Sequence, residues 1–348
     1  MCQESGQNDR PLLAITMGDV NGIGPEIVVK ALCERKTYGL CRPLVIGSAH
    51  ALERDRDQIG ASVQVARIQQ VEAAAFTYGQ IDLLCPEEVD IGQMERGMVD
   101  PTAGYAAVAF VTEGVRLTLR GAVDGIVTAP LNKEAMNQAG IRYPGHTELL
   151  AHLTDVREVR MILIVGGLRV VHVTVHVSLR TACDLITCDR VFKTIEIGRQ
   201  GILDLGIPNP RIAVAGLNPH AGEGGLFGDE ERLEIAPAVE HAQTLGWNVV
   251  GPLPPDTVFF RGARGAFDGI VAMYHDQGHI PLKLIGFEQG VNVTLGLPIV
   301  RTSVDHGTAF DIAGKGMADP TSLLRAIELA AVLVRSQKKR RRRAGNGT

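Results

Sequence analysis

The sequence predicts an α/β protein in which helices cover largely parallel sheets. Short apolar, β-rich runs alternate with segments of helical periodicity along all 348 residues, a pattern typical of strands connected by helices. The chain contains 40 glycines but only 4% aromatic residues, which suits an enzyme with many tight turns better than a β-sandwich. Its length allows two ordinary domains.

The first half of the chain provides strands and helices in strict alternation. Residues 11–16 predict the first strand, and residues 17–24 predict the turn that follows it. Pro25 at the first helical position and Glu26 in the first turn predict a helix to about residue 34. Further patterns predict a strand, a long helix and another strand, at residues 43–47, 102–120 and 124–129.

The second half continues the alternation. Runs at residues 161–165 and 169–177 flank Gly166-Gly167 and predict strands that can form a hairpin. The remaining segments predict a helix, a strand, a helix, a strand and a helix, at residues 189–205, 211–216, 229–245, 269–274 and 320–334. No repeat or low-complexity linker marks a domain boundary.

The composition indicates where in the cell the protein resides and which partners it does not bind. No apolar run is long enough to cross a bilayer, and the polar N-terminus lacks the apolar core of a secretory signal. Scattered cysteines without a CxxC pair indicate reduced thiols, so we expect a cytoplasmic protein that binds no membrane. The six cysteines are Cys2, Cys33, Cys41, Cys85, Cys183 and Cys188.

The net charge of −4 combines an acidic body with a run of six cations at residues 338–343. Such a run can contact anions or nucleic acid, but at a terminus it is more often a solvated, disordered end. We therefore expect disordered tails at residues 1–10 and 338–348. The acidic body argues against nucleic acid as a partner.

Three histidines follow predicted strands, where α/β folds place ligands. They are His176, His220 and His275. Any one of them is more often a hydrogen-bonded structural residue, but three in this position together indicate a shared divalent metal. His172 alternates onto the same strand face as His176. Because no turn follows it, we interpret it as structural.

A second group of residues is suited to an anion. Gly145-His146-Thr147-Glu148 opens a predicted helix, whose free N–H groups favour negative charge. Lys283, Asn292 and Arg301 could bind a phosphate or carboxylate with it, although Lys283 and Arg301 taken alone would be ordinary surface charge.

Several well-known motifs are absent. The chain has no G-x-G-x-x-G after a strand, no Walker A motif, no G-x-S-x-G elbow and no H-E-x-x-H. The residue patterns alone therefore indicate a metal-dependent α/β enzyme with an anionic substrate, and they leave any cofactor-binding residues unknown.

Longer blocks of sequence carry a family resemblance. They lie at residues 15–26 (ITMGDVNGIGPE), 144–148 (PGHTE), 216–223 (GLNPHAGE), 274–277 (YHDQ), 291–298 (VNVTLGLP) and 301–309 (RTSVDHGTA). In these blocks the chain resembles the 4-hydroxythreonine-4-phosphate dehydrogenase family. The matches run in family order from about residue 11 to residue 330.

The resemblance implies an isocitrate/isopropylmalate-dehydrogenase-like fold, in which two α/β domains flank an active-site cleft. We expect a discontinuous first domain at 11–145 plus about 290–337, and a second domain at about 146–290 with the metal ligands and dimer contacts. The family is homodimeric, with each active site shared across the interface. Its metal ligands match His176, His220 and His275, and its substrate contacts match His146, Thr147, Lys283, Asn292 and Arg301.

The resemblance also implies NAD(P)-dependent oxidation and decarboxylation of a small phosphorylated hydroxy acid. Candidate substrates are 4-phosphohydroxy-L-threonine of vitamin B6 biosynthesis and 4-phospho-D-threonate or D-erythronate of sugar-acid catabolism. Two departures bear on this choice. Gly18-Asp-Val-Asn-Gly22 replaces the usual Gly-Asp-Pro-Ala-Gly, and His279 stands where biosynthetic members usually carry an apolar residue. His279 resembles the catabolic paralogues more closely.

Other functions are compatible with parts of the sequence. Aromatic cis-dihydrodiol dehydrogenases of the same family also resemble the chain at His279, but the Gly-His-Thr-Glu motif suits a phosphorylated substrate. A three-histidine metal hydrolase or aldolase without nucleotide, and a non-enzymatic anion sensor, are the alternatives outside the family.

The mechanism that we expect starts at the metal, which lowers the pKa of the substrate hydroxyl. The metal could be Zn²⁺, Mg²⁺, Mn²⁺ or Co²⁺, and the hydride acceptor NAD or NADP. Lys283 is the preferred residue for orienting substrate and relaying a proton. Asp256 is a weaker catalytic candidate, and Asp276 could orient His275.

Overall fold

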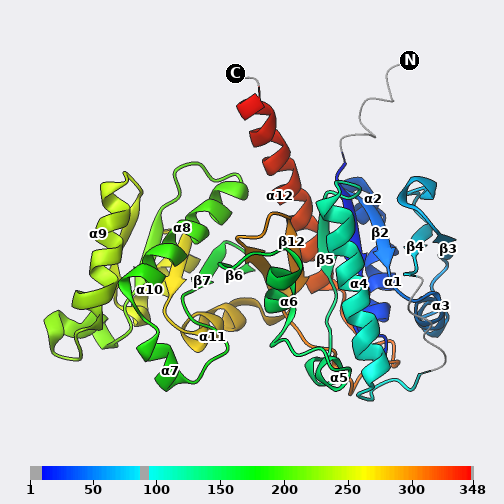
Figure 1. Ribbon diagram of the computed structural model, residues 1–348, viewed down its shortest axis with the longest axis horizontal. Coiled ribbons are helices and arrows are strands. Elements are labelled where there is room, and N and C mark those ends of the chain that lie inside the picture. The colour runs from blue at the N-terminus through cyan, green and yellow to red at the C-terminus, as the bar shows by residue number, and fades with distance from the viewer. Residues whose placement is uncertain (1–9, 87–93, 346–348) are drawn as a thin grey trace. The chain divides into compact units, whose positions relative to one another are not determined.

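The computed structural model describes residues 10–86 and 94–345, with side chains to residue 342. The chain divides into two compact units (Figure 1). Unit 1 extends to Arg157 and resumes at Leu297, and unit 2 comprises Glu158–Gly296. The sequence predicts these divisions at about residues 145 and 290. Because the first part of unit 1 ends at Arg157, the segment that contains His146 and Thr147 belongs to unit 1 instead of the second domain.

Unit 1 contains a parallel sheet in the order β3-β4-β2-β1-β5-β12. Its strands are β1 (Leu12–Thr16), β2 (Arg42–Ile46), β3 (Gln64–Ile68), β4 (Gln80–Leu84), β5 (Gly125–Thr128) and β12 (Arg301–Val304). All five residues of β1 are buried, because β1 lies between β2 and β5 and both of its faces are covered.

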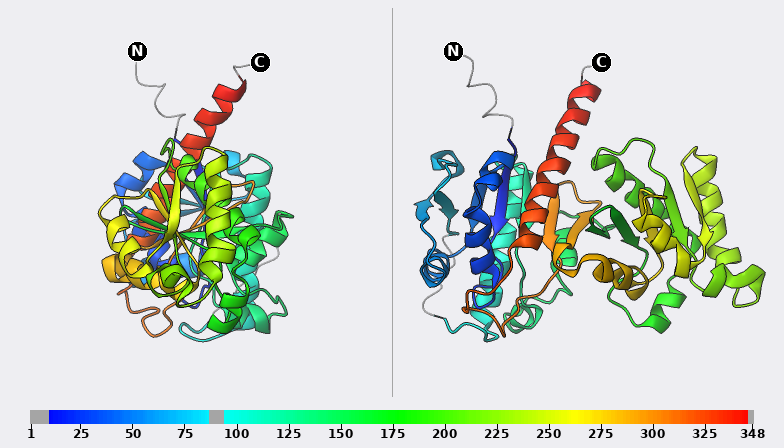
Figure 2. Two further views of the ribbon diagram at one scale, coloured as in Figure 1. Left: turned by 90° about the vertical axis from the view of Figure 1, so that its left-hand side faces the viewer. Right: turned by 180° about the vertical axis from the view of Figure 1, so that it is seen from behind.

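The helices of unit 1 cover both faces of this sheet. They are α1 (Gly24–Leu32), α2 (Arg35–Leu40), α3 (Ala49–Gln58), η2 (Val71–Ala73), α4 (Pro101–Leu119), α5 (Lys133–Gln138), α6 (His146–Leu153) and α12 (Thr321–Gly345). The two ribbon views place α4 on one face and α1 with α12 on the other (Figures 1 and 2). Asp100 caps α4 through the N–H groups of Thr102 and Ala103.

The end of α12 corrects the prediction of a tail without structure from residue 338. The helix continues to Gly345 and so includes the run of cations. Lys338 forms an ion pair with Asp124 on its own unit.

Unit 2 contains a mixed sheet in the order β11-β6-β7-β10-β8-β9. Its strands are β6 (Arg160–Val165), β7 (Leu168–His172), β8 (Ile212–Ala215), β9 (Val249–Leu253), β10 (Gly269–Ala272) and β11 (Val291–Leu295). β6 and β7 form the predicted hairpin, whereas β7, β10, β8 and β9 are parallel neighbours. The prediction of one strand over residues 169–177 was too long, because β7 ends at His172.

The helices of unit 2 are α7 (Leu179–Asp184), α8 (Cys188–Asp204), η3 (Pro219–Gly225), η4 (Glu231–Ile235), α9 (Ala236–Thr244), α10 (Pro255–Ala263), α11 (His275–Gly286) and η5 (Phe287–Gln289). Gly198 of α8 packs against Val171 on one face of the sheet. On the other face, α10 and α11 form a buried apolar cluster with the strands, to which Val258, Leu282 and Ile270 belong.

These features confirm the α/β class and the largely parallel sheets. Among the described cysteines all five are free thiols, as the sequence indicated. Within residues 10–86 and 94–345, no helix combines the length and apolarity needed to cross a membrane.

Candidate functional site

Unit 2 places the predicted metal ligands after three neighbouring parallel strands. His176 follows β7, His275 follows β10 and His220 follows β8, and these strands are adjacent in the order β7-β10-β8. The carboxyl ends of parallel strands lie at the same edge of a sheet, which is where α/β proteins bind ligands.

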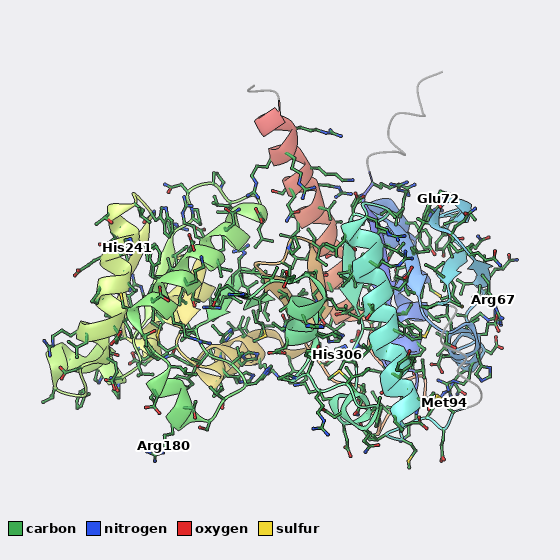
Figure 3. The ribbon with its side chains drawn as sticks, in the orientation of Figure 1. Arg67, Glu72, Met94, Arg180, His241 and His306 are labelled. Atoms are coloured by element: carbon green, nitrogen blue, oxygen red, sulfur yellow. The ribbon has the colours of Figure 1, made fainter. Side chains whose placement is uncertain are left out.

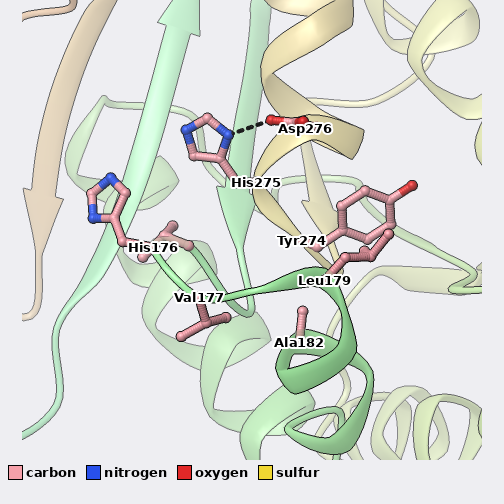
Figure 4. Close-up of a pocket in the computed structure, with 8 residues that line it drawn as sticks. His176, Val177, Leu179, Ala182, Tyr274, His275 and Asp276 are labelled. Carbon is pink, nitrogen blue, oxygen red and sulfur yellow. Dashed lines mark hydrogen bonds and ion pairs between the residues drawn. The ribbon is translucent and has the colours of Figure 1, made fainter.

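The structure brings His176 and His275 together. Their ring centroids lie 5.9 Å apart, and both side chains line a pocket of about 320 Å³ (Figure 4). Nδ1 of His275 is 2.7 Å from Oδ1 of Asp276, so the carboxylate orients this imidazole as the sequence suggested. A carboxylate on Nδ1 leaves Nε2 as the nitrogen that can bind a metal.

His220 is not part of this pocket. It is exposed, and its ring lies 6.4 Å from that of Phe227. The backbone around it runs through consecutive left-handed residues from His220 to Gly224, a conformation that costs roughly 1–2 kcal/mol for each non-glycine residue. Strain of this kind is found most often at functional sites.

Glu231 holds the His220 loop, although no sequence pattern pointed to this residue. Its buried carboxylate accepts hydrogen bonds from the N–H groups of Leu217 and Asn218, both at 2.7 Å, and from Nδ2 of Asn218 at 2.9 Å. Gln277 is a second missed residue. It accepts from the N–H of Met273 at 2.7 Å and donates to the carbonyl of Gly216 at 2.8 Å, so it joins the ends of β10 and β8.

Two further histidines pack next to His275. The ring of His279 stacks on that of His275, with centroids 3.7 Å apart and an interplanar angle of 10°. His172 lies 4.7 Å from His279. Burial and the neighbouring His275 lower the pKa of His279 to about 4, and burial also lowers that of His172 well below its usual value. Both rings are therefore neutral at pH 7.

The donor set fits a divalent metal in part. Two imidazoles, one of them oriented by a carboxylate, are suitable ligands for such an ion, and a catalytic site needs a third protein ligand. In the described part of a single chain, no group of three or more His, Cys, Asp or Glu side chains could hold an ion. One chain therefore supplies two of the three predicted ligands at this pocket.

Unit 1 contains the predicted anion-binding residues at the start of α6. Arg301 is buried and donates to Oγ1 of Thr128 from Nη2 at 2.7 Å and from Nε at 3.2 Å. Burial lowers its pKa to about 9, while the charge of Glu148 acts in the opposite direction. Nε2 of His146 is buried and has no hydrogen-bond partner among the described residues.

Lys133 belongs to the same group, although it was not among the residues predicted from the sequence. Its Nζ lies 3.9 Å from the position that a Cβ on Gly145 would occupy. Burial lowers the pKa of His146 well below its usual value, and the positive charges of Arg301 and Lys133 lower it further. Two cations, an unpartnered imidazole nitrogen and the N-terminus of α6 together form a group suited to a phosphate.

The other predicted residues are in unit 2. Lys283 is exposed on α11, with Nζ 5.1 Å from the centroid of Phe287. Asn292 lies in β11, and its Oδ1 is buried without a partner in the described chain. Asp256 is exposed in the first turn of α10 and does not line the His176–His275 pocket.

Comparison with known proteins gives the class. Residues 39–330 match the family of the pyridoxal phosphate biosynthetic protein PdxA, so the chain belongs to this family of dehydrogenases and is an oxidoreductase. It is 50% identical to D-threonate 4-phosphate dehydrogenase of Cupriavidus necator, over 93% of this chain and 97% of that protein.

Solved structures of the family agree with the fold. A 4-hydroxythreonine-4-phosphate dehydrogenase from Burkholderia phymatum is 50% identical, with a TM-score of 0.82 over 93% of this chain and 98% of that one. The enzyme of the same name from Klebsiella pneumoniae is 46% identical, with a TM-score of 0.86 over 94% and 98%. The resemblance seen in the sequence is thereby confirmed.

Proposed function

We propose that this oxidoreductase is a cytoplasmic, metal-dependent enzyme that uses NAD or NADP to oxidise and decarboxylate a small 4-phosphorylated hydroxy acid. The observation that carries the proposal is the pocket formed by His176 and His275, with Asp276 bound to Nδ1 of His275. The isocitrate/isopropylmalate-dehydrogenase-like cleft stays a prediction.

We assign the third metal ligand to His220 of a second copy of the chain in a homodimer. Support comes from large apolar side chains that are exposed in the single chain. Leu226 and Phe227 follow His220 in its loop and are 72% and 46% exposed, while Leu284 and Phe287 at the end of α11 are 82% and 64% exposed. Apolar surface of this extent favours association.

The cluster at α6 is our candidate for binding the substrate phosphate. Arg301, Lys133 and the N–H groups at His146 and Thr147 would supply positive charge and donors. A bound phosphate would also give the buried nitrogen of His146 a partner. Lys283 and Asn292 of unit 2 are proposed as further substrate contacts.

The metal and the nicotinamide have one part in the proposed reaction, and the side chains of the protein have another. A bound divalent ion supplies Lewis-acid polarisation of the substrate hydroxyl and its neighbouring oxygen, and a nicotinamide accepts the hydride. Lys283 orients the substrate and relays the hydroxyl proton. It shares one face of α11 with His275 and His279, because residues four apart lie on the same side of a helix. Asp256 is the second candidate for this role.

Among the possible substrates we favour D-threonate 4-phosphate. The Cupriavidus necator relative is named for that substrate, and His279 resembles the catabolic branch more than the biosynthetic one. D-erythronate 4-phosphate and 4-phosphohydroxy-L-threonine are the next candidates. An aromatic dihydrodiol has no phosphate, and so would not give the buried Nε2 of His146 the hydrogen-bond partner that a phosphate could supply.

The test is turnover by the purified full-length protein with each of the three phosphorylated acids, with NAD or NADP and a divalent metal. We expect the highest kcat/KM with D-threonate 4-phosphate, equal amounts of reduced nicotinamide and carbon dioxide, and much lower kcat/KM with unphosphorylated D-threonate. A chelator should stop the reaction, and added metal should restore it. Reduction of neither nucleotide with any phosphorylated acid would contradict the proposal, and activity untouched by chelation would contradict the metal.

A further inference from the structure

His279 and His172 are not among the proposed metal ligands. His279 is only 6% exposed, yet its ring lies flat against that of His275, the proposed ligand. The two residues are one helical turn apart on α11, so the backbone of one helix determines their spacing.

His279 is itself held in place on two sides. Its Nδ1 lies 3.0 Å from the carbonyl oxygen of His275, and with a carbonyl as partner this nitrogen must be the donor. The ring of His172, which is 1% exposed, contacts it from another direction, with centroids 4.7 Å apart. Gly278 provides the room for this ring, since a Cβ there would lie 2.4 Å from Nε2 of His172.

The stacked geometry makes His279 a support for His275 and not a further ligand. A metal ion lies in the plane of the imidazole that binds it, along the nitrogen lone pair. Because the two planes are nearly parallel at 10° and the rings are stacked, the nitrogen lone pairs of His275 and His279 lie in separate planes and would not converge on one ion.

The hydrogen bond between His275 and Asp276 also orients the imidazole, but it gives a weaker constraint. The side chain of Asp276 is 71% exposed, and an exposed polar contact is screened by water and contributes little. The buried face of His279 therefore restricts the rotation of His275 more than the carboxylate does.

We propose that His279, backed by His172, is a positioning residue that holds the His275 imidazole in the orientation required for metal binding. This inference rests on the proposed function, because it assumes that His275 is a ligand. Removing the hydrogen-bonding partner of a ligating histidine typically costs about 10–100-fold in metal affinity. We expect the stacked ring to have an effect near the lower end of this range, which is measurable without a turnover assay.

The experiment is a titration of the metal-free full-length protein with Co²⁺, followed by visible absorption. His279→Leu removes the flat ring, whereas His279→Phe keeps a ring of similar size for stacking. The matched control is His241→Leu on α9 (Figure 3), because His241 stacks on Phe192 at 4.1 Å and 11°, away from the pocket. Circular dichroism checks that each variant is folded.

We expect His279→Leu to raise the Kd for Co²⁺ by about tenfold or more and to shift the absorption bands. His279→Phe should stay within about threefold of the wild type, and His241→Leu should match the wild type. Equal Kd values for wild type and His279→Leu, or equal losses in the Leu and Phe variants, would overturn the stacking role while leaving the proposed function in place. A wild type that binds no Co²⁺ would instead overturn the proposed function.

Discussion

Asp19 is buried in the turn after β1, close to the negatively charged Asp100. Burial is the main cause that raises its pKa to about 6 from 3.8, and Asp100 adds to the effect, while N–H donors at Asn21 and Gly22 oppose it. In the fully unfolded chain the carboxyl would keep its ordinary pKa. The folded state therefore holds this proton more tightly than the unfolded state does.

The raised pKa of Asp19 makes the free energy of unfolding depend on pH. Well below pH 3.8 the carboxyl is protonated in both states, whereas between about pH 3.8 and 6 the unfolded chain has lost the proton that the folded state still holds. The free energy of unfolding should therefore fall by about 3 kcal/mol across this range from this group alone. Urea unfolding of wild type and Asp19→Asn between pH 4 and 8 measures it.

In that series the variant should become more stable than the wild type as the pH rises, because the amide cannot ionise. A stability difference between the two proteins that does not change with pH would contradict the assignment.

At the same scale, the candidate site was predicted only in part. Period-two alternation and strand ends identified His176 and His275, because those cues report which side chains reach the edge of a sheet. The interpretation of His172 as structural agrees with its burial. Glu231 and Lys133 were missed, since their roles depend on the conformation of the intervening loops, which neither strand nor helix periodicity predicts.

At the scale of elements, β7 and α11 show where sequence patterns mislead. The apolar alternation continues past His172, and Val173 and Thr174 still donate to the carbonyls of Ala272 and Met273. Alternation reports burial, which continues after the regular strand has ended. α11 was not predicted because Gly278 and Pro281 interrupt its pattern, although spacing of four between its histidines was visible in the sequence.

Gly278 lies where α11 packs closely on β7, so a larger residue there should destabilise the fold. Gly278→Ala places a methyl group 2.4 Å from Nε2 of His172 and 2.8 Å from Cγ1 of Val170, so we expect a loss of about 1–3 kcal/mol in unfolding free energy. Gly39→Ala in α2 is the matched control, because nothing lies within 4 Å of its new Cβ.

The control should instead stabilise by about 0.5–1 kcal/mol through higher helix propensity. Chemical denaturation of both variants supplies the comparison. Equal effects of the two substitutions would contradict the close contact between α11 and β7.

At the scale of the whole molecule, the described single chain provides a pocket with two imidazoles and leaves the third, His220, exposed on a strained loop. Order along the chain could not predict this separation, because strand neighbours alone would have placed all three histidines at one point. The exposed apolar side chains after His220 and at the end of α11 are the reason for expecting that a second copy completes the site.

The most direct measurement is a crystal structure of the full-length protein grown with Zn²⁺, with data collected at the zinc absorption edge. We predict an anomalous peak at about 2.0–2.1 Å from ring nitrogens of His176 and His275, with His220 of a second copy as the third ligand. A zinc ion bound without His220, or no ion at the His176–His275 pocket, would contradict the account.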